Sequence, residues 1–210
     1  MRLYLASTSP ARLATLRAVG VEPVLLASNV DEDAAVAAAG PLTAAEMVLL
    51  LARLKAEGVV GRAVDGESID GFILGGDSAF ELDGIVYGKP HEPAVARERW
   101  LLQRGREGEL HSGHWLIDHR GGVVGGATGG VSTSSVRFAA DISDDEIDAY
   151  VATGEPLQVA GAFTIDSLGA PFISEVRGDP HAVVGLSVAL VRALLLRFGV
   201  RWHTLWNRAL

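Results

Sequence analysis

The feature that most constrains the fold is a strand-like N-terminus that leads directly into a helix signal. Residues 2–6 are rich in strand formers and are followed by Ser7-Thr8-Ser9-Pro10. Ser9 suits the N-cap of a helix, and Pro10 suits its first turn, where the amide that proline lacks has no helical partner in any case. Gly20 would end this helix, and a second strand-like run covers residues 23–26. The chain therefore begins with a predicted strand, tight loop, helix and second strand.

Strand and helix signals continue along the rest of the chain. Capping boxes or long apolar patterns predict four further helices, at residues 43–58, 92–104, 143–154 and 183–198. Further strands are expected at 70–78, 110–118 and 123–138, the last two as an antiparallel ribbon. Leu82-Asp83-Gly84-Ile85 has the composition of a hairpin turn. The expected fold class is α/β, with a mixed twisted sheet and flanking helices.

Composition excludes several classes of function. The 210 residues are 49% apolar, which allows one domain or two closely packed lobes. The chain has no cysteine, so disulfides, thiolate metal sites and cysteine nucleophiles are excluded. A net charge of −8 argues against a broad nucleic-acid surface. With no signal-peptide or membrane-span pattern, we expect a cytoplasmic protein with neither nucleic-acid nor membrane partners.

The start of the first helix has the elements of a phosphate site. If Ser9 is the N-cap, Arg12 occupies the third helical position, where the positive end of the helix dipole disfavours a cation. A bound anion would remove this conflict, and the helix amides, the hydroxyls of Ser7 and Ser9, and the Arg12 guanidinium could all contact it. The alternative is an ordinary Ser-Pro helix start with a solvated arginine.

Only two of the 18 basic side chains are lysines, Lys55 and Lys89. Lys89 lies between Gly88 and Pro90, and the proline favours an extended conformation for the residue before it. A compact ammonium held in this way suits a phosphate oxygen. The alternatives are a solvated turn lysine at 89 and, at 55, a helix residue whose ammonium extends from an apolar stripe to water.

Three carboxylates are candidates for catalysis or metal binding. Asp77 follows an apolar strand and two glycines, and α/β sheets bind ligands just beyond the ends of such strands. Asp31 and Glu32 lie in an acidic segment, expected to be a loop, and could supply oxygen ligands to Mg²⁺. The alternatives are a turn aspartate bonded to its own backbone and a solvated acidic loop.

Common nucleotide and metal motifs are missing from the sequence. The chain has neither the Gly-x-x-x-x-Gly-Lys-Ser/Thr loop nor a Gly-x-Gly-x-x-Gly segment after a strand. His111 and His114 are three residues apart on a predicted strand and would point to opposite faces. Kinases, GTPases and Rossmann dehydrogenases therefore lose support, and no zinc site is assigned.

The chain nevertheless resembles the Maf family, through short motifs that occur in order along nearly its whole length. These motifs are Leu5-Ala6-Ser7-Thr8-Ser9-Pro10-Ala11-Arg12, Ser28-Asn29-Val30-Asp31-Glu32, Leu54-Lys55-Ala56, Gly76-Asp77-Ser78, Gly88-Lys89-Pro90, Gly154-Glu155-Pro156-Leu157, Ala160-Gly161-Ala162-Phe163 and Gly178-Asp179-Pro180 with Val184-Gly185-Leu186. Each motif is weak alone, but their number, order and spacing make coincidence very unlikely.

The resemblance implies a single Maf-like domain over 1–210, with two lobes around a central cleft, generally dimeric and dependent on a divalent metal such as Mg²⁺ or Mn²⁺. It implies a pyrophosphatase that converts a nucleoside triphosphate to its monophosphate and pyrophosphate. The implied roles are phosphate binding by Ser7, Ser9 and Arg12, catalysis by Asp77, Lys55 and Lys89, an acidic position at Asp31 or Glu32, and metal binding by Asp77 and Glu32.

Three positions depart from the usual family motifs. Ser-Pro-Arg-Arg appears here as Ser-Pro-Ala-Arg, and Gly-Ala-Asp-Thr as Gly-Gly-Asp-Ser. A glutamine expected near the base appears as Asp166, so Asp166 is a candidate for base recognition or, alternatively, a cap for the amides of Leu168 or Gly169. The resemblance suggests pyrimidine or modified-base triphosphates, such as dTTP or UTP, and a role in nucleotide house-cleaning.

Two other functions remain as rivals. One is a nucleotide-binding regulator, in line with the historical association of the family with septum formation. The other is a nucleotidyltransferase, which would use similar cations but join a second substrate. Carboxylates that face a polyphosphate favour hydrolysis, because a protein that only binds gains nothing from them.

Overall fold

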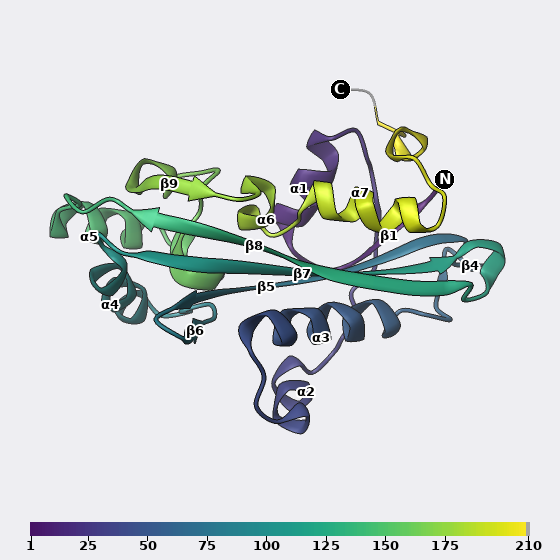
Figure 1. Ribbon diagram of the computed structural model, residues 1–210, viewed down its shortest axis with the longest axis horizontal. Coiled ribbons are helices and arrows are strands. Elements are labelled where there is room, and N and C mark those ends of the chain that lie inside the picture. The colour runs from purple at the N-terminus through teal and green to yellow at the C-terminus, as the bar shows by residue number, and fades with distance from the viewer. Residues whose placement is uncertain (209–210) are drawn as a thin grey trace. The chain divides into compact units, whose positions relative to one another are not determined.

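The computed structural model describes residues 1–208 and confirms the α/β class with a mixed sheet (Figure 1). Its main sheet has the strand order β2-β1-β5-β7-β8-β9, and β6 pairs with β5. β1 is parallel to β2 and β5, whereas β5–β6 and β8–β9 are antiparallel. The strands are β1 (Leu3–Ala6), β2 (Val24–Leu25), β5 (Gly71–Leu82), β6 (Ile85–Tyr87), β7 (Glu107–His119), β8 (Gly126–Phe138) and β9 (Ile173–Arg177), with a separate pair, β3 (Ala63–Val64) and β4 (Glu67–Ser68).

Seven α-helices and five 3₁₀ turns are found within residues 1–208. The helices are α1 (Pro10–Ala18), α2 (Glu32–Ala39), α3 (Ala44–Glu57), α4 (Pro93–Gln103), α5 (Asp144–Ala152), α6 (Pro180–Val184) and α7 (Val188–Arg197). The turns are η1 (Arg120–Gly122), η2 (Glu155–Gln158), η3 (Ala160–Ala162), η4 (Ala170–Phe172) and η5 (Trp202–Leu205). Both predicted capping boxes are confirmed, at the starts of α3 and α5.

The chain divides into two compact units, and β5, β7 and β8 contribute residues to both. The first unit contains 1–77, 112–132 and the residues from 185 onward, and the second contains 78–111 and 133–184. The expected cleft between two lobes stays a prediction.

In the first unit, helices cover both faces of the sheet. α3 lies on one face, and α1 and α7 lie on the other (Figure 1). The alternation of β1 explains this layering, because Leu3 and Leu5 pack with the side of α1 and α7 while Tyr4 and Ala6 pack with the side of α3. A strand buried on both faces reads as an unbroken apolar run, as residues 3–6 do.

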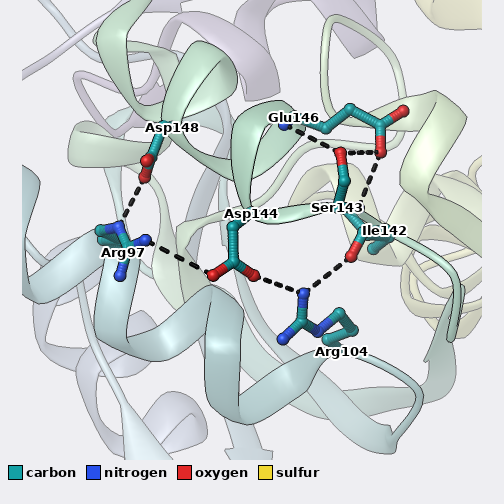
Figure 2. Close-up of polar contacts among 7 residues, drawn as sticks. All are labelled: Arg97, Arg104, Ile142, Ser143, Asp144, Glu146 and Asp148. Atoms are coloured by element: carbon teal, nitrogen blue, oxygen red, sulfur yellow. Dashed lines mark hydrogen bonds and ion pairs between the residues drawn. The ribbon is translucent and has the colours of Figure 1, made fainter.

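The second unit has its own aromatic core, which includes Phe80, Trp100, Phe138 and Phe163. α4 and α5 pack side by side, and ion pairs join their exposed surfaces (Figure 2). Asp144 lies in the first turn of α5 and forms ion pairs with Arg104 at 2.7 Å and with Arg97 at 3.8 Å. The helix dipole favours acidic residues at this position, so one carboxylate stabilises both the helix start and the pairing of the two helices.

Two predictions of secondary structure were wrong, one of a loop and one of a helix. The segment 31–33 is not a loop, because Asp31 caps α2 and accepts a hydrogen bond from the amide of Ala34. The single helix expected over 183–198 is instead α6 and α7, separated at Gly185. Gly185 has a φ of +117°, which no helix residue adopts, and Ser187 caps α7 by accepting from the amide of Leu190.

Candidate active site

The central pair of the site is Lys55 on α3 and Asp77 on β5. These elements approach closely at Gly75, where an added Cβ would lie only 2.0 Å from the carbonyl oxygen of Ala52. Gly113 on β7 is equally restricted, since its Cβ would lie 2.4 Å from the carbonyl oxygen of Val48. The glycines therefore let α3 lie directly against the sheet, at a distance from which Lys55 reaches Asp77.

Lys55 joins two carboxylates. Its Nζ lies 2.7 Å from Oδ1 of Asp77 and 2.8 Å from Oε1 of Glu32. The Lys55 and Asp77 side chains are only 10% and 12% exposed, whereas that of Glu32 is 48% exposed. The ammonium of Lys55 is therefore directed at two carboxylates, and its interpretation as a helix lysine that extends to water is wrong.

Asp77 does not follow the end of its strand, as expected, but lies within β5, which continues to Leu82. It is the neighbouring strand that ends there, because Ala6 of β1 is paired with Gly75. The loop that begins at Ser7 therefore starts beside Gly76 and Asp77. The alternative of a turn aspartate bonded to its own backbone is also wrong.

The surroundings of Asp77 change its acidity. Burial raises the pKa of Asp77 above that of an ordinary aspartate, and the positive charges of Lys55 and Arg12 oppose this rise without cancelling it. A carboxyl group with a raised pKa binds protons more readily than a solvated one. Asp77 is therefore suited to accept a proton as well as to stabilise a cation.

Arg12 is buried at the start of α1 and is not the solvated arginine of the alternative interpretation. Ser9 caps this helix by accepting from the amide of Arg12 at 3.4 Å. The guanidinium donates from NH1 to Oγ of Ser7 at 3.2 Å and from Nε to the carbonyl oxygen of Gly185 at 2.9 Å. Burial lowers the pKa of Arg12, and the charges of Asp77 and Glu32 oppose this change.

Gly76 brings the guanidinium of Arg12 close to Asp77. A Cβ at position 76 would lie 3.2 Å from Nε of Arg12 and 3.6 Å from Nδ1 of His114. The arginine side chain therefore passes over the backbone next to Asp77. The first unit of the chain therefore brings together six of the predicted site residues: Ser7, Ser9, Arg12, Glu32, Lys55 and Asp77.

His114 is a supporting residue that the sequence did not reveal. It is buried, and its Nε2 accepts a hydrogen bond from the amide of Ser187 at 2.7 Å. Its proton is therefore on Nδ1, which lies 2.7 Å from the carbonyl oxygen of Gly113. The segment 185–187 is held by His114 and in turn holds Arg12. Only the motif Val184-Gly185-Leu186 pointed to this segment.

The remaining candidates are not joined to this cluster by any described contact. Asp31 is used as the cap of α2. Lys89 is exposed in the second unit, after β6, and its catalytic role stays a prediction. Asp166 is exposed in the same unit, and residues 162–165 before it form no strand. The alternative role of Asp166 as a cap is wrong, because the amides of Leu168 and Gly169 donate to Glu155.

Comparisons with known proteins extend over nearly the whole chain. A family model described as "Maf-like protein" matches residues 2–198. A protein from Leifsonia xyli subsp. xyli named "Nucleoside triphosphate pyrophosphatase" is 65% identical over 213 residues, which cover 100% of this chain and 98% of that protein. Proteins with the same name from Salinispora tropica and Saccharopolyspora erythraea are 49% and 47% identical, each over 99% of this chain and over 88% and 98% of their own lengths.

Proposed function

Because this chain belongs to the Maf family, we propose that it is a nucleoside triphosphate pyrophosphatase that releases a nucleoside monophosphate and pyrophosphate. The observation that carries the proposal is the buried pair of Lys55 and Asp77 beside Arg12. The two cations in this position, Lys55 and Arg12, can balance the charge of a polyphosphate. A buried carboxylate repels that polyphosphate, so it favours hydrolysis over a regulator that only binds nucleotide.

In the proposed reaction, a water molecule attacks the α-phosphorus in line with the leaving pyrophosphate. A bond forms between the water oxygen and the α-phosphorus, and the bond to the bridging oxygen breaks. Asp77 orients the water and accepts its proton, for which its raised pKa is suited. Arg12 and Lys55 balance the charge on the phosphate oxygens, and a catalytic role for Lys89 is proposed on the family resemblance alone.

The carboxylates of this site suit a divalent cation. Oxygens of Asp77 and Glu32 both lie within 2.8 Å of one ammonium nitrogen, so they already converge on a single positive charge. Within residues 1–208, no group of three or more acidic or histidine side chains is arranged to hold a metal. Mg²⁺ usually takes one or two carboxylates and completes its shell with water and phosphate oxygens. We propose that Asp77 and Glu32 hold Mg²⁺ or Mn²⁺, which would neutralise the polyphosphate and make a bound water more acidic.

We further propose that the substrate is a pyrimidine or modified-base triphosphate and that the protein is a cytoplasmic homodimer that acts in nucleotide house-cleaning. The family resemblance supports the substrate class, the dimer and the house-cleaning role, and the absence of cysteine suits a cytoplasmic location. The net charge of −8 supports the absence of a nucleic-acid partner. Among residues 1–208, no helix is both long and apolar enough to cross a membrane.

The identity of the first product tests the proposed bond cleavage. With Mg²⁺ or Mn²⁺, the purified protein should release pyrophosphate from at least one nucleoside triphosphate, because the cations are proposed to stabilise that leaving group. The measurement is phosphate detection with and without added inorganic pyrophosphatase, over a panel that includes UTP, dTTP and methylated-base triphosphates. Orthophosphate and a nucleoside diphosphate as the first products, without the added enzyme, would refute this bond assignment.

The pH dependence should show the raised pKa of Asp77. The proton-accepting form of Asp77 is lost as the pH falls through that pKa, so activity should fall on the acid side at a higher pH than for an ordinary aspartate. We would measure kcat/KM across pH with the metal–nucleotide complex as the varied substrate, because kcat/KM reports the ionisation of the free protein, to which this pKa belongs. An activity that stays constant down to the range of an ordinary aspartate would contradict this role.

A further inference from the structure

The carboxylate of Glu155 lies at the centre of a hydrogen-bond cluster in the second unit. The residue is half-buried and begins η2, directly after Gly154. It accepts five hydrogen bonds, from three hydroxyl groups and two backbone amides. The donors are Thr164 Oγ1 at 2.5 Å, Ser167 Oγ at 2.6 Å, Tyr150 Oη at 3.0 Å, Gly169 N at 3.2 Å and Leu168 N at 3.3 Å.

These contacts need an ionised carboxylate. Although partial burial opposes ionisation, the hydroxyls of Ser167, Thr164 and Tyr150 lower the pKa of Glu155 below its ordinary value. An ionised carboxylate only accepts hydrogen bonds, which matches a ring of donors. A glutamine of the same shape would direct an NH₂ group at some of those donors and would lose their bonds.

Four of the five donors belong to the segment 164–169. Its far end is closely packed, since a Cβ at Gly169 would lie 2.7 Å from both Tyr150 Oη and the carbonyl oxygen of Thr164. Thr164 and Gly169 are also joined to each other by a hydrogen bond of 3.2 Å. Asp166 lies between the residues held in this way, with its side chain exposed. The backbone that presents Asp166 is therefore fixed by contacts from Glu155.

We infer that Glu155 is a positioning residue that holds the segment 164–169, and through it Asp166, in the conformation that discriminates between nucleobases. This inference rests on the proposed function. Glu155 itself is not proposed to contact the substrate, since its oxygens are occupied by the segment it holds. Its effect on the choice of nucleotide should therefore require the Asp166 side chain.

The test compares Glu155→Gln with the parent over the nucleotide panel. We expect kcat/KM ratios between nucleotides to change by about tenfold, with a smaller change in kcat for the best substrate, because polar contacts set discrimination. Hydrogen exchange at the amides of Leu168 and Gly169 should become at least about tenfold faster, because both amides lose a charged acceptor. Ser167→Ala, which removes one exposed donor, should change the ratios in the same direction and is a second variant should Glu155→Gln fold poorly.

The matched control is Glu146→Gln. Glu146 is also an ionised acceptor in the second unit, but its bonds are to the amide and hydroxyl of Ser143 in the capping box of α5. This variant should leave both the nucleotide ratios and the exchange of 168 and 169 as in the parent. An equal effect of Glu146→Gln would reduce the role of Glu155 to general stability.

A double-variant cycle decides whether Glu155 acts through Asp166. In an Asp166→Ala background, Glu155→Gln should no longer change the nucleotide ratios. Three outcomes would each overturn the inference. The nucleotide ratios could be unchanged in the single variant Glu155→Gln, they could be unchanged in the single variant Asp166→Ala, or Glu155→Gln could have its full effect in the Asp166→Ala background. Should the parent release pyrophosphate from no nucleotide, the proposed function fails, and the same ratios are taken from equilibrium binding of the panel.

Discussion

Replacing Asp77 with asparagine is expected to lower turnover by about 10²-fold or more while the protein remains folded. Asparagine has nearly the same shape, so β5 and its packing against α3 should persist. It cannot accept the proton of the attacking water, and it removes one of the two carboxylates proposed to hold the metal. Lys55 would keep Glu32 as an ionic partner, at 2.8 Å. The measurement is kcat with the best nucleotide, together with circular dichroism and thermal unfolding.

Asp118→Asn is the matched control for this substitution. Asp118 lies on β7 in the same unit, its side chain is 12% exposed like that of Asp77, and it pairs with Arg120 at 2.6 Å. The control therefore removes an equally buried paired aspartate at a place with no proposed role in catalysis. It should retain turnover close to that of the parent. Equal turnover in both variants would remove Asp77 from the mechanism.

Replacing Lys55 with glutamine should also lower turnover by about 10²-fold or more, since it removes a cation proposed to contact the polyphosphate. It also leaves Asp77 and Glu32 without their shared partner. Breaking a buried ion pair typically costs about 3–5 kcal/mol, and we expect the lower end because Arg12 remains near Asp77. Thermal or denaturant unfolding at neutral pH measures this cost.

The pH at which the residual kcat/KM falls on the acid side gives a second measurement for Lys55→Gln. The ammonium of Lys55 lowers the pKa of Asp77. Removing this ammonium should therefore raise that pKa further and move the acid-side fall in activity to higher pH. The control is Arg53→Gln on the same helix, which removes an exposed cation paired with Glu57 at 3.8 Å. If activity falls at the same pH in Lys55→Gln and in the parent, this fall does not report the ionisation of Asp77.

Local signals predicted most elements correctly because they act within a few residues of one another. The Ser9 cap with Pro10 and the capping boxes at Thr43 and Ser143 all form as expected. The start of α2 could also have been recognised, because Asp31 is a good cap and alanine-rich residues follow it. The run of acidic residues at 31–33 instead favours a loop.

The sequence by itself determined the fold class and the starts of α1, α3, α4 and α5, through local capping and apolar patterns, and the residue types of the site, through the motifs shared with the Maf family. Only the tertiary structure decided what those residues contact. Arg12 is held by Gly185, 173 residues away, and Lys55 reaches Asp77 across 22 residues because Gly75 admits α3 to the sheet. Glu155, rather than Asp166, receives the amides of 168 and 169. Capping and strand alternation depend on neighbours in the chain, whereas burial, ion pairing and the pKa of Asp77 depend on segments that meet only after folding.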